Sequence, residues 1–327
     1  MQGAVDPREE GAARSVRPQA LMLALFGDQI LGRSTTVSTG SVIAVLDRLG
    51  VSEHATRATA ARMVRHGLLR SVRQGRQAFL GLTPHGSEVL RDGRSRLEAD
   101  VVDHHWDGRW TLLTFSVPES RRADRHALRT RLAWAGFGML RSGLWVSPRE
   151  ADVSGALAGL ELLGHAQVFR AEAALWTDPA RIVREAWDLP ATEAAYQRFI
   201  DRWADGGPRR EDGAGGAAGA AGRESAGRRA GVAAAHAPGA RTDLPDLPDL
   251  PGTSGAPGGD EPDDLSRRIL LTAEWLLLVR NDPRLPSALL PEEWSGVRAQ
   301  RLFRALLRRL VGPADKLAGE LLETTAE

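Results

Sequence analysis

Residues 206–259 form a stretch that cannot build a packed core, and it divides the chain. Its 54 residues include 14 glycines and 6 prolines, and Val232 is its one β-branched aliphatic residue. Such a segment buries too little apolar surface to offset the conformational entropy that it would lose on folding. A repeated Asp-Leu-Pro triplet at 243–251 favours an extended spacer. We therefore predict a linker or long disordered loop, with folded regions on both sides.

The basic residues are almost all arginine, and this excludes several classes of enzyme. Lys316 is the one lysine among 43 basic residues, and the chain has no cysteine. The missing thiol excludes a cysteine nucleophile, a cysteine zinc site and a disulfide. P-loop proteins, protein kinases and pyridoxal enzymes need a lysine within a motif, and the sequence GPADKLAG around Lys316 matches none of these. We expect no enzyme, no catalytic residue and no cofactor.

Residues 18–98 carry the signals of four helices and one hairpin. Apolar residues recur at helical spacing, Ser38 and Ser52 stand where N-caps belong, and a Gly-containing turn joins two alternating runs. The expected helices are 18–31, 42–49, 52–66 and 85–97, and the expected hairpin strands are 69–73 and 78–82. This order of elements is typical of a winged helix-turn-helix domain, whose third helix lies in the major groove of DNA.

Charge is concentrated in this third helix and the hairpin. Six arginines lie between residues 52 and 76 against the single acid Glu53, although the whole chain has a formal net charge of only +1. Such a basic face is what DNA affinity requires. The alternative is a solvated face of a small helical domain. We predict that the DNA-contacting residues are Ser52, His54, Arg57, Arg62, Arg73 and Arg76.

These six residues have different expected roles. Arg57 and Arg62 lie early in the third helix, where a guanidinium can bond to both acceptors of a guanine. Arg73 and Arg76 lie at the hairpin turn and are expected to contact phosphate, which positions the protein without reading sequence. Ser52 and His54 begin the same helix.

Two further regions follow. Residues 106–178 alternate as strand, helix, strand, strand, helix, strand, which predicts a ferredoxin-like sheet with helices on one face. Residues 179–327 are predicted to be a helical C-terminal domain interrupted by the linker. The expected fold class is therefore α+β. The expected elements of these two regions are strands at 109–117, 137–140, 144–147 and 166–170, and helices at 120–135, 150–163, 192–203, 264–280, 298–310 and 313–322.

Several segments resemble the repressor family of phenylacetic-acid degradation, the PaaX-like regulators. The resemblance covers most of the chain outside the N-terminal tail and the linker. Its middle motif, an aromatic residue followed by G-x-x-G-L-W-V-S-P, is the most specific part. The segments that carry the resemblance are 25–28 (LFGD), 51–65 (VSEHATRATAARMVR), 67–80 (GLLRSVRQGRQAFL), 107–118 (DGRWTLLTFSVP), 132–148 (LAWAGFGMLRSGLWVSP), 289–294 (LLPEEW) and 301–310.

The resemblance implies a transcriptional repressor that forms a homodimer. It also implies release from operator DNA by a coenzyme A thioester of an aromatic acid, such as phenylacetyl-CoA. An effector-free DNA-binding regulator is a second possibility. The site of an effector is not readable from the sequence, because each tryptophan has core packing as its ordinary role. The helix at 121–131 is rich in arginine and could meet the phosphates of an acyl-CoA, but an exposed polar face explains it better.

A metal-dependent nuclease is the alternative function. The middle region also resembles the small ferredoxin-like nucleases of CRISPR adaptation, which hold a divalent metal with an aspartate after the first strand. Ser116 stands at that position, and a hydroxyl is a poor substitute for a carboxylate beside Mg²⁺. We therefore expect a structural role for this region, with dimerisation across the sheet or a helix face. The sequence DHHWD at 103–107 is more typical of a connector than of a metal site.

No membrane segment is expected. No stretch approaches 18 consecutive apolar residues, and the N-terminus is acidic and lacks the apolar core of a signal peptide. We predict a cytoplasmic protein without a metal.

Overall fold

The computed structural model describes residues 16–207 and 262–326, and it is a mixed α+β protein with two antiparallel sheets. The predicted linker lies outside the described residues except for Gly206 and Gly207. The helices are α1 (Pro18–Gln29), α2 (Thr39–Arg48), α3 (Glu53–Arg65), α4 (Pro84–Glu98), α5 (Arg122–Trp134), α6 (Ser154–Ala158), α7 (Pro179–Ala186), α8 (Leu189–Trp203), α9 (Asp264–Asn281) and α10 (Ser295–Leu321). The strands are β1 (Thr35–Ser38), β2 (Leu69–Gln74), β3 (Gln77–Leu82), β4 (Arg109–Phe115), β5 (Gly138–Arg141), β6 (Leu144–Ser147), β7 (Ala166–Glu172) and β8 (Thr324–Ala326).

The N-terminal helices begin and end where local side chains and glycines require. The Ser38 hydroxyl accepts the backbone N–H of Ser41 at 3.1 Å, and the Ser52 hydroxyl accepts that of Ala55 at 3.3 Å. These bonds satisfy donors that a helix cannot satisfy itself. Gly67, directly after the end of α3, has a φ of 69°, which glycine adopts without a steric cost. The predicted caps of α2 and α3 are confirmed.

The first sheet has the strand order β2-β3-β1-β8, and all its neighbours are antiparallel. The predicted hairpin is confirmed as β2 and β3, with Gln74 paired to Gln77 across the turn. Two strands were not predicted. β1 pairs with β3, and β8 comes from the far end of the chain to pair with β1, so that Thr36 lies opposite Thr325.

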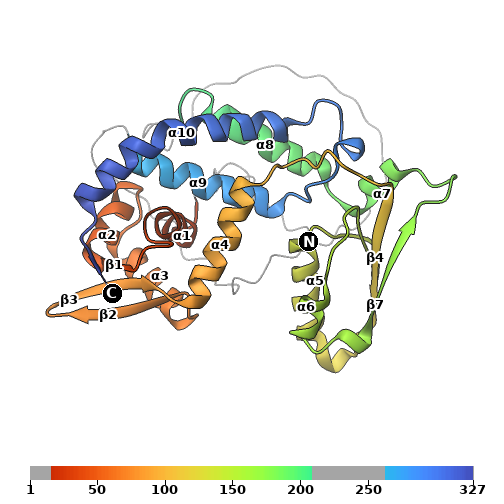
Figure 1. Cartoon of the computed structure of the whole chain (residues 1–327), viewed down its shortest axis with the longest axis horizontal. Coiled ribbons are helices and arrows are strands. Elements are labelled where there is room, and N and C mark those ends of the chain that lie inside the picture. Colours follow the sequence, from red (N-terminus) through yellow and green to blue (C-terminus); the bar gives the residue numbers. More distant parts are fainter. Residues whose placement is uncertain (1–15, 208–261, 327) are drawn as a thin grey trace, which may run out of the picture.

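The helix-turn-helix region and the C-terminal helices share one hydrophobic core. Leu25, Leu46 and Met63 are buried together with Ile269 of α9 and Ala314 of α10. The core therefore joins residues of the predicted 18–98 region to residues of the predicted 179–327 region. Figure 1 shows α9 and α10 lying side by side, above α1 and α2 in this view.

The end of the chain corrects one expectation. Two helices were predicted, at 298–310 and 313–322, but α10 is a single helix of 27 residues with Pro313 inside it. Proline lacks the N–H that would bond to the fourth preceding carbonyl, so it ordinarily ends or kinks a helix. Here Leu306 on one side of Pro313 and Ala318 on the other are both buried, and this packing holds the two halves together.

The second sheet has the strand order β5-β6-β4-β7 and is antiparallel throughout. Leu113 of β4 is fully buried in one cluster with Leu128 and Leu132 of α5. The prediction of a helix at 150–163 is wrong, because α6 covers only residues 154–158 of that range. Gly155 and Gly159 lie inside this range and explain the difference, since each glycine costs about 1 kcal/mol in a helix relative to alanine.

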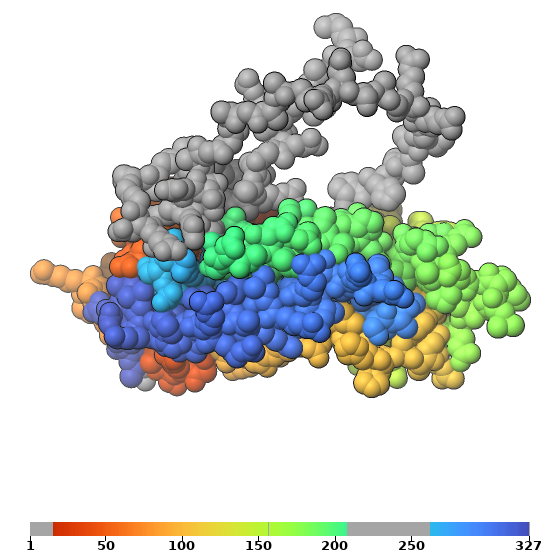
Figure 2. All heavy atoms as spheres, turned by 90° about the horizontal axis from the view of Figure 1, so that it is seen from above, coloured from red at the N-terminus to blue at the C-terminus, as the bar shows by residue number. Residues whose placement is uncertain are grey.

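The molecule is elongated, with its two sheets at opposite ends. Figure 1 shows β2 and β3 at one end and β4 and β7 at the other. Figure 2 shows the dark blue surface of α10 along one side of the molecule, ending short of the green end that carries β7. An aromatic core lies between the sheets, where Trp275 stacks on Phe303 with ring centroids 4.7 Å apart.

Candidate nucleic-acid interface

The helix α3 has one packed face and one open face. Thr56, Thr59, Ala60 and Met63 are buried, and they hold the helix against α1, α2 and β2. The predicted contact residues lie elsewhere on the helix. His54 and Arg57 are exposed, and Arg62 is half-buried at the edge of the open face. Ser52, which caps the helix, is exposed as well.

The arginines of α3 differ in how they are held. The Arg57 guanidinium bonds to the Glu53 carboxylate one turn earlier at 2.7 Å, and both side chains are about 60% exposed. Such an exposed pair contributes little stability and exchanges readily for another anion. Arg62 donates to the Thr59 hydroxyl at 3.1 Å. Arg65 is exposed and has no polar partner within the described residues.

The hairpin places two more arginines in solvent. Arg73 lies near the end of β2, opposite Ala78, and Arg76 lies in the turn that follows Gly75. Both side chains are exposed, and neither has an ion pair or hydrogen bond among the residues that the structure covers. Figure 1 shows the β2–β3 hairpin extending away from the helices near α3.

The C-terminal segment around Glu323 forms hydrogen bonds with this region, and these contacts were not predicted from the sequence. The backbone N–H of Ser38 donates to the Glu323 carbonyl at 2.8 Å, and the Glu323 N–H donates to the Ser41 hydroxyl at 2.9 Å. Gln77 at the start of β3 also reaches the Glu323 carboxylate at 3.4 Å. Residue 323 therefore fixes both the N-terminus of α2 and the hairpin. No local pattern could have indicated a contact between positions so distant in the chain.

A cluster of three charged residues, two of them largely buried, attaches α9 to the same unit. Arg268 is nearly buried and bonds to Asp28 of α1 at 3.1 Å and to Asp315 of α10 at 2.6 Å. Burial raises the pKa of Asp28, and the neighbouring Arg268 opposes that rise. Loss of Arg268 would leave the largely buried Asp28 without this counter-charge, which is costlier than loss of a surface pair.

Sequence comparisons with known families match most of the described chain. Residues 17–86 match the profile described as PaaX-like protein, residues 103–183 the PaaX protein central Cas2-like domain, and residues 260–320 the PaaX-like protein C-terminal domain. The chain belongs to the PaaX-like family.

Two similar proteins extend this comparison. The transcriptional repressor PaaX of Escherichia coli (strain K12) is 26% identical over 318 residues, which cover 94% of this chain and 84% of that protein. The uncharacterized protein Rv0674 from Mycobacterium tuberculosis superposes with a TM-score of 0.53, is 19% identical, and is matched over 92% of this chain and 98% of its own. The second likeness concerns the fold alone. Membership of the PaaX-like family supports a non-enzymatic DNA-binding regulator.

The Cas2-like region of this PaaX-like chain carries the serine on which the nuclease alternative depended. Ser116 directly follows β4, is exposed, and donates its backbone N–H to the His165 carbonyl at 2.9 Å. His104 and His105 are exposed in the connector before β4. Among the described residues, no group of three or more His, Asp or Glu side chains is placed to hold a metal ion.

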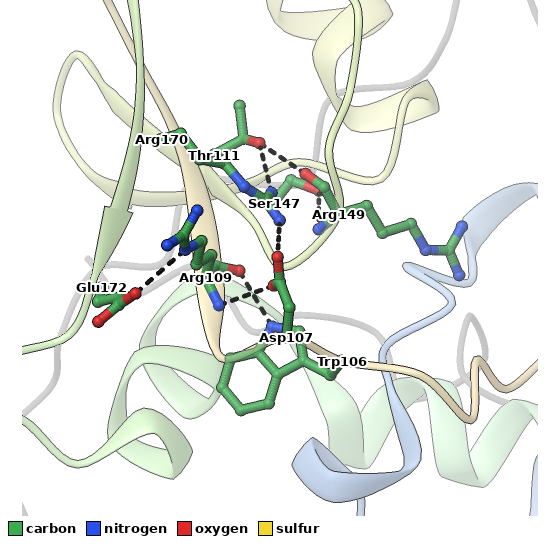
Figure 3. A network of polar contacts seen from close by, with 8 residues as sticks. All are labelled: Trp106, Asp107, Arg109, Thr111, Ser147, Arg149, Arg170 and Glu172. Atoms are coloured by element: carbon green, nitrogen blue, oxygen red, sulfur yellow. Dashed lines mark hydrogen bonds and ion pairs between the residues drawn. The ribbon is translucent and has the colours of Figure 1, made fainter.

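The DHHWD connector instead belongs to a network of ion pairs and hydrogen bonds, drawn in Figure 3. Asp107 accepts the backbone N–H of Arg109 at 2.9 Å and the Arg170 guanidinium at 2.7 Å. These two bonds, the first more than the second, hold the pKa of Asp107 below its ordinary value. Glu172 bonds to the Arg109 guanidinium at 3.1 Å. The network ties the connector to β4 and β7.

The arginine-rich α5 differs from α3 in its partners. Arg121, just before α5, donates to the Asp124 carboxylate at 2.7 Å and to the Leu160 carbonyl at 2.7 Å. Arg125 pairs with Glu119 at 2.5 Å. These two arginines of the PaaX-like chain are thus satisfied within the protein.

A buried carboxylate lies where the helical region meets the Cas2-like region. Asp282 accepts the Tyr196 hydroxyl and the backbone N–H of Arg284, the latter at 2.6 Å. Burial raises the pKa of Asp282, while the bond from Tyr196 opposes the rise. Arg149 of the Cas2-like region donates to the Arg284 carbonyl and so joins the two parts.

No helix in the described part of the chain has the length and apolarity needed to cross a membrane.

Proposed function

We propose that this chain is a sequence-specific transcriptional repressor that binds operator DNA as a homodimer in the cytoplasm. The observation that carries the proposal is the open face of α3 beside the hairpin, where Arg57, Arg73 and Arg76 are exposed together. A recognition helix and a wing contact DNA in this way in winged helix-turn-helix domains. The relation to the transcriptional repressor of E. coli supports repression.

In this proposal the contacts divide by role. The helix α3 enters the major groove, where Ser52 and His54 lie at its N-terminus and Arg57 and Arg62 reach base edges. The wing carries Arg73 and Arg76 to the neighbouring phosphates, which set the position of the protein. The strand order of the second sheet supports a ferredoxin-like middle domain. The other parts of this α+β fold are the winged helix-turn-helix domain and the C-terminal helices.

An aryl-CoA thioester such as phenylacetyl-CoA is the proposed effector. Support comes from the family to which the chain belongs, since PaaX-like regulators take their name from phenylacetic acid degradation. The thioester would release the repressor by favouring a conformation with lower affinity for DNA.

Genome-wide capture of DNA fragments by the purified protein tests the repressor. We expect a few fragments to be strongly enriched, and we expect the Arg57→Ala/Arg62→Ala variant to lose that enrichment. Equal capture of all fragments by the wild-type protein would contradict sequence-specific binding.

Release of a captured duplex tests the effector. Phenylacetyl-CoA should dissociate the complex in a gel-shift titration, whereas phenylacetate and coenzyme A, each added alone, should leave it intact. Persistence of the complex at saturating thioester would contradict this effector without affecting the assignment of DNA binding.

A further inference from the structure

The solvent face of α10 carries a row of basic side chains. Residues 298–316 contain six basic residues and one acid, Asp315. Two of these charges are neutralised inside the protein, since Arg304 pairs with Asp100 at 3.0 Å and Asp315 with Arg268 at 2.6 Å. The other five residues are exposed, and none has an ion pair or hydrogen bond among the described residues. These five form the basic row: Arg298, Arg301, Arg308, Arg309 and Lys316.

Helical geometry places the basic row on one side of α10. At about 3.6 residues per turn, its five side chains fall within about a third of the circumference, and at about 1.5 Å per residue the row is about 27 Å long. The opposite side is buried, with Ala299, Phe303 and Leu306 in the aromatic core. Gly312 lies within the row, and no neighbouring part of the described chain comes within 4 Å of the position that a Cβ would take there. This face is therefore open along its length.

The charges of the row are not compensated along the helix. Exposed helices usually place an acid three or four positions from a cation, where the two side chains meet. None of the four arginines of the row has such an acid. Arg301 has Arg298 and Arg304 at this spacing instead, and Arg308 follows Arg304 by four positions. Like charges so placed destabilise a helix, and an external anion would relieve their repulsion.

A phosphate backbone is the occupant that the basic row fits. A guanidinium binds phosphate through two parallel hydrogen bonds. Double-stranded DNA carries one charge per about 1.7 Å of its axis, so a row of this length faces several phosphates at once. A protein partner would need apolar anchors, and a membrane would need an apolar helix face to insert. The apolar side of α10 is already buried in the protein.

The basic row lies away from the candidate DNA surface at α3. Figure 1 shows α10 along the top of the molecule, with α3 and the β2–β3 hairpin below it. Figure 2, which is seen from above, shows the dark blue surface of α10 facing the viewer. An operator duplex on α3 therefore leaves the row uncovered.

We propose that the exposed face of α10 is a second DNA-binding surface, which holds the phosphate backbone of a duplex other than the operator at α3. The contacts are to phosphates alone, so binding there is independent of sequence and strongly dependent on salt. One repressor then holds two separate DNA segments at once. The inference goes beyond the proposed function and rests on it only for the operator bound at α3.

Binding of a second duplex to operator-saturated protein tests the proposal. The full chain is saturated with an excess of unlabelled, captured operator duplex, which occupies α3, and is then added to a labelled duplex of unrelated sequence. We expect the anisotropy of the labelled duplex to rise with the wild type. Arg301→Ala/Arg308→Ala should bind the labelled duplex roughly tenfold more weakly, with a slope of log affinity against log salt that is shallower by about 2. The operator affinity of this variant should equal that of the wild type, which also shows that it is folded.

The matched control is Arg122→Ala/Arg141→Ala, which removes two exposed arginines of the Cas2-like region and the same total charge. It should bind the second duplex as the wild type does. A wild type that binds no second duplex once it is saturated, or two double variants that weaken this binding equally, would overturn the proposal. Polyglutamate that binds the wild type when the second duplex does not would also overturn it and would indicate an acidic protein partner. Operator binding without a second duplex contradicts this inference alone, whereas absence of operator binding contradicts the proposed function, so the two can fail separately.

Discussion

Two arginine-rich surfaces of this chain differ in how their charges are satisfied. Around α5, Arg121 and Arg125 bond to nearby carboxylates and to a backbone carbonyl. Within residues 52–76, which form α3 and most of the hairpin, the one acid is Glu53, and Arg73 and Arg76 have no polar partner among the described residues. A count of arginines would rank the two surfaces as similar. The difference lies in which guanidinium groups remain available to an external anion.

The largest effect is expected where α3 meets base edges. Arg57→Ala/Arg62→Ala should reduce the preference for the captured operator over an unrelated duplex by roughly a hundredfold or more, since each bidentate contact contributes about 1–3 kcal/mol of discrimination. Competition gel shifts measure the ratio of the two affinities. An unchanged ratio would show that α3 does not read sequence through these arginines.

A smaller and different effect is expected at the hairpin. Arg73→Ala/Arg76→Ala should weaken binding to operator and unrelated DNA by similar factors, because phosphate contacts carry no sequence information. The slope of log affinity against log salt should also become shallower by about 2, at roughly 0.9 for each lost contact. Binding measured at several salt concentrations gives the slope. A selective loss of operator binding with the slope unchanged would contradict the phosphate role.

The α5 surface is expected not to contribute to DNA binding. Arg121→Ala should leave DNA affinity within about twofold of wild type, because this guanidinium is already bonded inside the protein. Its loss should lower the free energy of unfolding by about 1 kcal/mol, the usual value for a partly exposed bonded arginine. Denaturant unfolding and a gel shift provide the two readings. A strong fall in DNA affinity would remove the distinction between the surfaces.

The smallest expected effect is a dependence of stability on pH. The folded-state pKa of Asp282 lies above its ordinary value of 3.8, so the folded protein retains a proton that the unfolded chain releases in the interval between the two values. The contribution of Asp282 to stability is therefore greatest below the ordinary pKa and is lost as pH rises through the raised value. Asp282→Asn does not titrate, so the wild type should lose stability relative to it as pH rises above 3.8. Thermal unfolding across this range measures the difference. A constant difference would exclude this titration.

Local signals predicted the elements of the candidate site well. Ser38 and Ser52 cap their helices through hydrogen bonds from residues three positions later, and the Gln74–Gln77 turn closes a hairpin, so each feature depends on residues close together in the sequence. The arginine positions on α3 followed from helical periodicity. Which of these arginines are left without internal partners could not be predicted, because that depends on packing between distant segments.

Tertiary contacts decided the parts that were not predicted. Proline at 313 is a valid local signal to end a helix, but burial on both sides of it outweighs that signal in α10. The short strands β1 and β8 have no extended alternating pattern of their own and form because they lie beside each other. The family resemblance, which rests on whole motifs, was the part of the sequence reasoning that depended least on such contacts.

The pairing of β8 with β1 has a consequence for the order in which the protein is made. Residues 35–38 leave the ribosome long before residues 324–326, so β1 keeps one side unpaired until β8 has been synthesised. A contact between such distant positions also raises the contact order of the N-terminal sheet and slows its completion. A nascent or truncated chain without residues 324–326 therefore lacks one strand of the sheet that supports the hairpin, and the sheet is complete only after these residues have been made.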